Sequence, residues 1–87
     1  MSGTVNVKIL FFAKAREIFG KSVDYLEVET PITHKNLLEI IVNHYSLNQL
    51  RNQIILSINQ DFLEPGDQIL TLKPGDELAV IPPLSGG

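Results

Sequence analysis

The chain has 87 residues, of which 44% are hydrophobic and 20% charged, so we expect one globular domain with a small core. Its formal net charge of −3 argues against a nucleic-acid partner, because no basic stripe is present to neutralise phosphates. No apolar run is long enough to span a bilayer, and the first residues lack the charged-then-apolar pattern of an export signal. We therefore expect a cytosolic protein without a membrane partner.

The sequence has no cysteine, which removes thiolate nucleophiles and zinc–cysteine sites and fits a reducing compartment. With only His34 and His44 as further strong metal ligands, we expect no metal site and no bound cofactor. Both histidines fall near or within the apolar side of a predicted helix, where a histidine is usually a partly buried packing residue.

The first predicted elements are a strand over residues 4–12 and a short helix over residues 13–19. Alternation in the strand directs one apolar set to the core and leaves Leu10 and Phe12 on the other face. Gly20 stands where a left-handed helix cap is wanted, and Arg16 lies on the outer side of the helix. We interpret Arg16 as a surface charge that could also contact an acidic partner at the rim of an interface.

Residues 23–29 alternate imperfectly, as expected for an edge strand, and their three carboxylates would discourage edge-to-edge aggregation. Residues 30–33 are interpreted as a breaker followed by a helix start, with Thr33 as the N-cap. The helix predicted over residues 34–45 is apolar over a broad arc, so it should lie across a sheet.

The second half of the chain predicts several short strands. After a polar connection over residues 46–52, strands are expected at residues 54–58 and 62–63 with a turn between them. Two Pro-Gly-Asp repeats, at residues 65–67 and 74–76, suit type II turns and precede strands at residues 68–72 and 77–81.

This order of elements predicts an α+β, β-grasp (ubiquitin-like) mixed sheet with one main helix packed on one face. The first and last strands should lie side by side and parallel at the centre. Residues 1–81 would form the domain and residues 82–87 an extended functional tail. The face that the helix leaves open should then carry an apolar patch that binds a protein, made of Leu10, Phe12, Ala79 and Ile81, joined by Ile55 and continued by Leu84.

The tail itself is the strongest functional signal. Pro82 and Pro83 should end the last strand and extend the backbone outward. Gly86 and Gly87 make the tip as thin as a polypeptide allows, so that a carboxylate on Gly87 could enter a channel that any side chain would block.

Three segments resemble the small, sulfur-carrier subunit of molybdopterin synthase, and the likeness extends over essentially the whole chain. They are Ile9-Leu10-Phe11-Phe12-Ala13-Lys14-Ala15-Arg16-Glu17, the eukaryotic-like Arg51-Asn52-Gln53-Ile54-Ile55, and Leu72-Lys73-Pro74-Gly75-Asp76-Glu77-Leu78-Ala79-Val80-Ile81-Pro82-Pro83-Leu84-Ser85-Gly86-Gly87. The proline pair that runs into Ser-Gly-Gly is the most specific of these features.

The resemblance implies a sulfur carrier, the non-catalytic donor subunit of a sulfurtransferase complex. An activating enzyme would adenylate Gly87, so that AMP and then sulfur ride transiently on it, and Gly86 would let the tip thread into a partner. The resulting thiocarboxylate would donate sulfur to cyclic pyranopterin monophosphate within a large catalytic subunit. The family's complex contains two small and two large subunits.

Three alternatives remain open from the sequence. The tail could serve thiamine synthesis or transfer-RNA thiolation, although its Pro-Pro-Leu-Ser context fits those relatives less well. The protein could be a ubiquitin-like modifier conjugated to lysines. It could also be an interaction domain with an inert tail, because a fold alone does not decide function.

Overall fold

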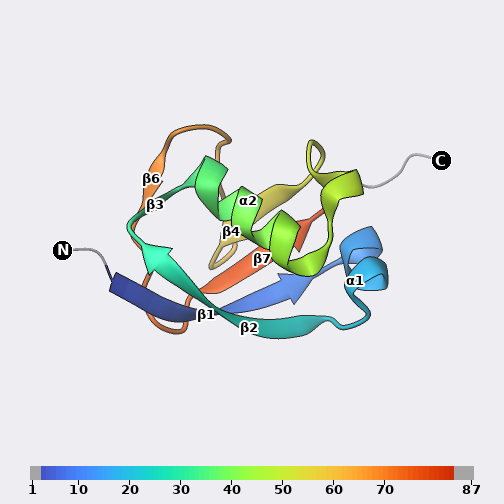
Figure 1. Cartoon of the computed structure of the whole chain (residues 1–87), viewed down its shortest axis with the longest axis horizontal. Coiled ribbons are helices and arrows are strands. Elements are labelled where there is room, and N and C mark those ends of the chain that lie inside the picture. The colour runs from blue at the N-terminus through green and yellow to red at the C-terminus, as the bar shows by residue number, and fades with distance from the viewer. Residues whose placement is uncertain (1–2, 84–87) are drawn as a thin grey trace.

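The structure is a computed structural model that describes residues 3–83, and it contains two sheets and three helical segments (Figure 1). Their bounds are β1 Gly3–Phe11, α1 Ala13–Phe19, β2 Val23–Thr30, β3 Ile32–Thr33, α2 His34–Tyr45, the 3₁₀ helix η1 Asn48–Leu50, β4 Ile55–Ile58, β5 Asp61–Phe62, β6 Ile69–Leu70 and β7 Glu77–Ile81.

The main sheet has five strands in the order β2-β1-β7-β4-β5. β1 and β7 are parallel and adjacent, with Ile9 opposite Leu78, while β2 flanks β1 and β4 flanks β7 in antiparallel pairs. The predicted arrangement, with the first and last strands joined at the centre, is thereby confirmed. This is the β-grasp fold class expected from the order of elements.

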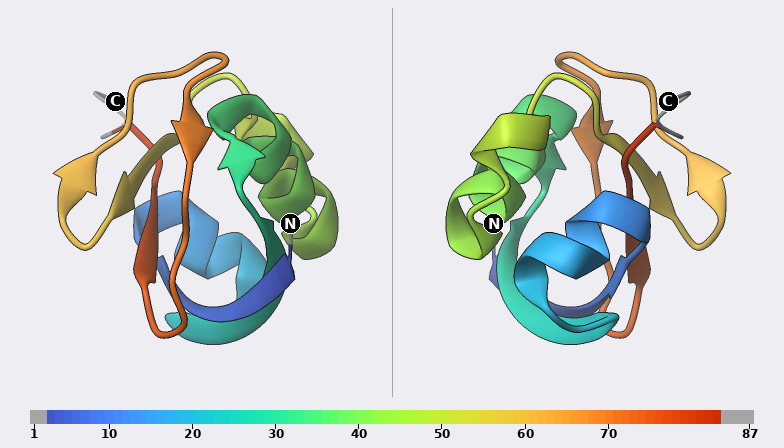
Figure 2. Two further views of the ribbon diagram at one scale, coloured as in Figure 1. Left: turned by 90° about the vertical axis from the view of Figure 1, so that its left-hand side faces the viewer. Right: turned by 90° about the vertical axis from the view of Figure 1, so that its right-hand side faces the viewer.

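The core lies between this sheet and α2, which crosses one side of the curved sheet (Figure 2). Alternation places Val7, Ile9 and Phe11 of β1 in this core, as predicted, and each is at most 1% exposed. α2 contributes a stripe at helical spacing, namely Leu37, Ile41, Val42 and Tyr45. Leu47 and Leu50 close the core beyond the end of α2.

The helix ends follow the predicted caps. The Thr33 hydroxyl accepts a hydrogen bond from the Asn36 N–H at 3.1 Å, which satisfies one of the unpaired donors in the first turn of α2. Gly20 ends α1 with φ at 92°, and its N–H donates to the Arg16 carbonyl at 2.7 Å. A side chain is strained at such a φ, which is why glycine suits this position.

Three aromatic rings join β1, α1 and α2 at one end of the core. Phe11, Phe19 and Tyr45 pack with ring centroids 4.6 to 4.8 Å apart. The Tyr45 hydroxyl donates to the Asp24 carboxylate at 2.9 Å, which ties α2 to the edge strand β2. Burial, together with this carboxylate, raises the pKa of the Tyr45 hydroxyl above its ordinary value.

The two histidines differ in their surroundings. His34, the first residue of α2, is 3% exposed, and its burial lowers the pKa of the imidazole below 6.5. It is the buried packing residue that the sequence predicted. His44 is exposed, and its ring stands edge-on to Tyr45 at a centroid distance of 4.7 Å.

The prediction for residues 30–33 was incomplete, because residues 32 and 33 also form the short strand β3. It pairs antiparallel with β6 in a separate two-stranded sheet. The strand predicted over residues 68–72 is reduced to Ile69–Leu70, since the Leu72 N–H donates to the Thr30 hydroxyl at 2.8 Å instead of to a strand. β1, β2, β4 and β5 differ from their predicted bounds by one residue at one or both ends, and Phe12 becomes the N-cap of α1.

Within residues 3–83, no helix has the length and apolar character needed to cross a membrane.

Candidate functional site

The face of the main sheet opposite α2 carries the residues that the sequence assigned to partner binding. In the parallel pair of central strands, Leu10 stands beside Ala79. Ile55 of β4 stands beside Ile81 of β7. Phe12 follows directly, and its N–H donates to the Val80 carbonyl at 3.3 Å. The sheet therefore brings all five predicted side chains onto one surface.

These five residues contribute unequally to that surface. Phe12 and Ile55 are each 46% exposed, a large fraction for side chains of this size and hydrophobicity. Leu10 and Ile81 are half-buried. Ala79 is only 8% exposed, because its neighbours in the central strands cover its short side chain. Ala79 forms the floor of the surface, and its role in partner binding stays a prediction.

Two further aromatic residues lie on this face and were not predicted. Tyr25 stands opposite Lys8 in the β1–β2 pair and is 66% exposed, while Phe62 stands opposite Ser57 in the β4–β5 pair and is 71% exposed. Paired residues share a face of a sheet, so the register that places Leu10 and Ala79 also places these two. We call the whole set the outer apolar face, namely Leu10, Phe12, Tyr25, Ile55, Phe62, Ala79 and Ile81.

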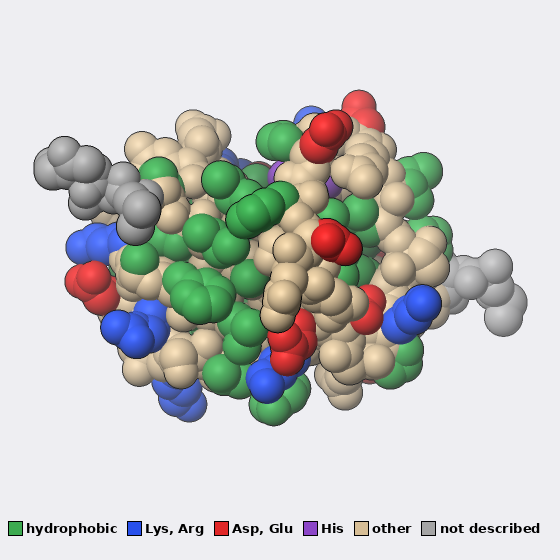
Figure 3. Space-filling view, turned by 180° about the vertical axis from the view of Figure 1, so that it is seen from behind, with side chains coloured by type: hydrophobic (Ala, Val, Ile, Leu, Met, Phe, Trp, Pro, Cys, Tyr) green, Lys and Arg blue, Asp and Glu red, His purple; other side chains and the backbone are tan. Residues whose placement is uncertain are grey.

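Figure 3 shows hydrophobic side chains gathered over this side of the molecule, with charged groups around them. One ion pair lies on the face, between Lys8 of β1 and Glu77 of β7 at 3.7 Å. Contiguous apolar surface of this kind is a mark of protein–protein binding. The centre of such interfaces is rich in aromatic residues and the rim is polar, and this face has the same arrangement.

The tail begins at the edge of this face. Pro82 is buried and Pro83 is exposed, so the first proline packs against the domain before the chain leaves it. Both prolines line a groove of about 560 Å³ together with Ala13, Lys14, Glu17, Leu50 and Gln53. We call this groove the tail root.

α1 presents Lys14 and Glu17, not Arg16, to the tail root. Residues three apart in a helix share a face, whereas Arg16 lies on another side of α1, where it is exposed. The role predicted for Arg16 stays a prediction. Leu84, Ser85, Gly86 and Gly87 lie outside the described residues. Among residues 3–83, no three His, Asp or Glu side chains are grouped as metal ligands.

The central parallel pair, the covering helix and the open apolar face define a ubiquitin-like β-grasp protein. The sequence profile of the ThiS family matches residues 9–87. Solved structures agree on the fold. SAMP1 from Haloferax volcanii superposes with a TM-score of 0.71 at 24% identity, covering 94% of this chain and 99% of that one. Subunits 1 and 2 of the molybdopterin-converting factor from Helicobacter pylori were solved as a complex, and a chain of it gives a TM-score of 0.65 at 19% identity, covering 95% of this chain and 100% of that one.

Sequence comparison is more specific. The molybdopterin synthase sulfur carrier subunit of Homo sapiens is 48% identical over 82 residues, which is 93% of each chain. The subunit of the same name from Anopheles gambiae is 45% identical over 91 aligned positions, covering 100% of both chains. The chain belongs to the ThiS family, in the branch of the molybdopterin synthase sulfur carrier subunits.

Proposed function

We propose that this protein is the sulfur carrier subunit of a molybdopterin synthase and that Gly87 is the residue that carries the sulfur. One structural observation supports the proposal above others. β7 occupies the centre of the sheet, presents Ile81 on the outer apolar face, and continues directly into Pro82 at the tail root. A partner that binds this face is therefore guided to the tail.

The proposed chemistry takes place at the carboxylate of Gly87. A carboxylate is a poor acyl donor, so its oxygen first attacks the α-phosphate of ATP and releases pyrophosphate, which gives an acyl-adenylate. Sulfur at the sulfide level, supplied by the activating enzyme, then attacks the acyl carbon and displaces AMP. The product is a thiocarboxylate. The family profile extends through Gly87, and this supports placing the reaction there.

The loaded tail would enter the large catalytic subunit and donate its sulfur to cyclic pyranopterin monophosphate. Hydrolysis of the acyl–sulfur bond returns the Gly87 carboxylate for another cycle. Side-chain-free Gly86 and Gly87 suit a narrow channel. The Helicobacter pylori neighbour, solved as a complex of two subunits, supports a partner of this kind. We propose an assembly of two small and two large subunits, loaded by an adenylating sulfurtransferase.

Reconstitution with defined components tests the proposal. The purified chain is incubated with its adenylating sulfurtransferase, ATP and a sulfide source, and its intact mass is measured. We expect a gain equal to the mass difference between a sulfur and an oxygen atom, located in the C-terminal peptide. The loaded chain, mixed with the large subunit and the pyranopterin, should then yield molybdopterin.

The control is a variant with one alanine added after Gly87. It should fold and bind the large subunit, yet fail to yield molybdopterin, because the added side chain blocks the channel. Equal product from this variant would contradict the proposal. Isopeptide-linked adducts on lysines in place of a thiocarboxylate would instead support the modifier alternative.

A further inference from the structure

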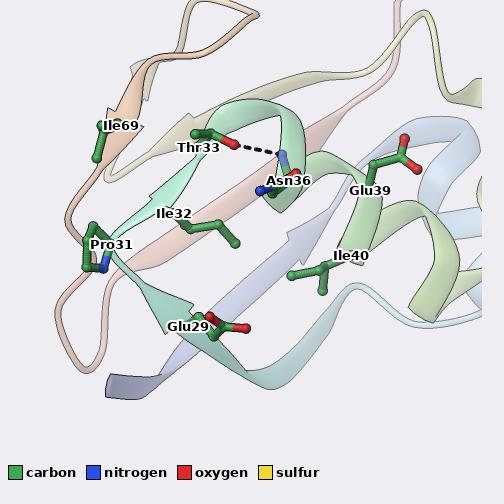
Figure 4. Close-up of a pocket in the computed structure, with 8 residues that line it drawn as sticks. All are labelled: Glu29, Pro31, Ile32, Thr33, Asn36, Glu39, Ile40 and Ile69. Atoms are coloured by element: carbon green, nitrogen blue, oxygen red, sulfur yellow. Dashed lines mark hydrogen bonds between the residues drawn. The ribbon is translucent and has the colours of Figure 1, made fainter. Parts of the chain in front are cut away.

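A second surface lies on the helix side of the molecule, between α2 and the edge strand β2. It is a groove of about 440 Å³, with Ile32, Ile40 and Ile69 as its apolar walls and Glu29 at its border. Figure 4 shows Ile32 of β3 and Ile40 of α2 pointing toward each other, with Glu29 of β2 below them and Ile69 on β6 to one side. The residues that line the groove come from β2, β3, α2 and β6, and Figure 1 shows where these elements lie in the fold. The register places the outer apolar face on the reverse side of the sheet.

The outer edge of β2 offers backbone hydrogen-bonding groups, and Glu29 of this strand lines the groove. Within residues 3–83, β2 pairs with β1 alone and forms the edge of the main sheet. The Phe11 N–H donates to the Ser22 carbonyl at 2.9 Å, and antiparallel pairs alternate between bonded and non-bonded positions. Residues 24, 26 and 28 therefore direct their backbone groups to β1. Tyr25, Glu27 and Glu29 direct theirs to the open edge.

The carboxylates along this edge indicate which kind of segment could bind there. Glu27 and Glu29 are exposed, and within the described residues Glu29 has no ion-pair partner. Glu39, at the far side of the groove, is already paired with Arg51. A second copy of this chain would place these carboxylates against their equivalents, which is unfavourable. A basic strand would meet opposite charge instead.

We propose that the α2–β2 groove is a docking site for an extended, basic segment of another protein, which pairs with β2 as a sixth strand. Main-chain bonds to Tyr25, Glu27 and Glu29 supply the pairing. Alternate side chains of the added strand face opposite sides of the sheet. One set is apolar and packs over Ile40, and the other carries lysine or arginine beside Glu27 and Glu29. The basic side chains of the added strand lie beside Glu27 and Glu29 at the β2 margin of the sheet. Leu10, Phe12, Ile55 and Ile81 stay uncovered, so the segment binds at the same time as the large subunit.

The test uses a synthetic peptide of alternating lysine and valine, added to the ¹⁵N-labelled chain. At a peptide concentration ten times the Kd, exchange of the Tyr25, Glu27 and Glu29 amide protons should slow by about tenfold, as mass action requires. The amides of residues 24, 26 and 28, already bonded to β1, should change little. This alternation distinguishes strand pairing from loose electrostatic attraction. Unchanged exchange at the three outward amides would overturn the proposal.

Charge and location are tested by variants and by a second peptide. Glu29→Lys should weaken peptide binding about fivefold to tenfold, as expected when one exposed ion pair becomes a repulsion. Glu64→Lys makes the same change at an exposed site that does not line the groove, and it should have no effect. A glutamate–valine peptide should not bind. Equal binding of the two peptides, or equal loss in both variants, would contradict the proposal.

The large subunit provides an independent check. The chain carrying Phe12→Asp, a change on the outer apolar face, should bind the lysine–valine peptide with unaltered affinity. Adding saturating large subunit to the wild-type chain should leave peptide binding intact as well. Competition between the two would place the peptide on the outer apolar face and overturn the assignment to β2. Failure of the sulfur-carrier proposal would leave these results unchanged.

Discussion

Phe12 is a large aromatic residue that lies outside the core. It follows β1, caps α1 and leaves 46% of its surface exposed beside the central strands. A large ring in this position loses contact with water only when a partner covers it. At protein interfaces such central aromatic residues commonly dominate the binding free energy.

We predict that Phe12→Asp weakens binding of the large subunit by about 2 to 4 kcal/mol, because a charge would be buried in place of a ring. The free energy of unfolding should change little, since the side chain is outside the core. Isothermal titration calorimetry measures the first quantity and urea denaturation the second. Ile69→Asp is the matched control, because Ile69 is 70% exposed but lies on β6, away from the outer apolar face.

His34 gives a second prediction at this scale. Burial lowers its pKa below 6.5, so between the two pKa values the unfolded chain binds more protons than the folded chain. The free energy of unfolding should therefore be highest above pH 6.5 and fall as the pH drops through this value, levelling off below the folded pKa. Urea denaturation from about pH 8 to pH 5 measures the slope. His34→Gln should flatten it, and an equal slope in that variant would assign the effect to another group.

At the scale of elements, helix and strand periodicity in the sequence was sufficient to locate α1, α2 and β7 with their observed bounds. Caps could be predicted because Thr33 and Gly20 act within one turn of their own helix. The pair β3–β6 could not, because each strand has two residues and exists only through the other. Two residues are too few to show the alternation of apolar and polar side chains that would predict a strand.

The same distinction applies to the candidate site. Leu10, Phe12 and Ile81 could be predicted, since each lies on a strand whose alternation is clear. Tyr25 and Phe62 could be assigned to this face only from the pairing register of their strands, which cannot be read from the sequence. Pro82 lies beside α1, η1 and the segment after η1, all of which are far from it along the chain.

The N-cap of α2 provides a prediction for an element. Thr33→Ala removes the acceptor of the Asn36 N–H and should lower the free energy of unfolding by about 1 kcal/mol. Thr33→Ser keeps a hydroxyl at the same position and should retain most of the stability. Thermal and urea unfolding followed by circular dichroism compares the three proteins. Equal losses in both variants would assign the effect to β3 pairing and not to the cap.

For the molecule as a whole, one core holds every major element together. Leu78 of β7 is fully buried, stands beside Ile9 and Ile58, and belongs to the cluster under α2. Domains of this size are stable by only about 5 to 15 kcal/mol, so one large cavity removes a considerable share. The central strands are therefore where the whole fold is most sensitive.

We predict that Leu78→Ala lowers the free energy of unfolding by about 2 to 5 kcal/mol, through lost burial and the cavity left behind. Ile69→Ala, at a residue 70% exposed, should change it by less than about 0.5 kcal/mol. Urea titration monitored by tyrosine fluorescence and by circular dichroism should give one coincident transition for each protein. Separate transitions would show that the small sheet unfolds independently of the main one.

The central place of β7 also affects how the protein is made. Translation delivers β1 first and β7 last of the strands, yet these two must lie side by side before the main sheet can close. A nascent chain stays open until residues 77–81 have left the ribosome. A product cut short before Glu77 lacks its middle strand as well as its tail, so it remains unfolded and accessible to proteases. Loss of β7 therefore removes the fold and the tail together.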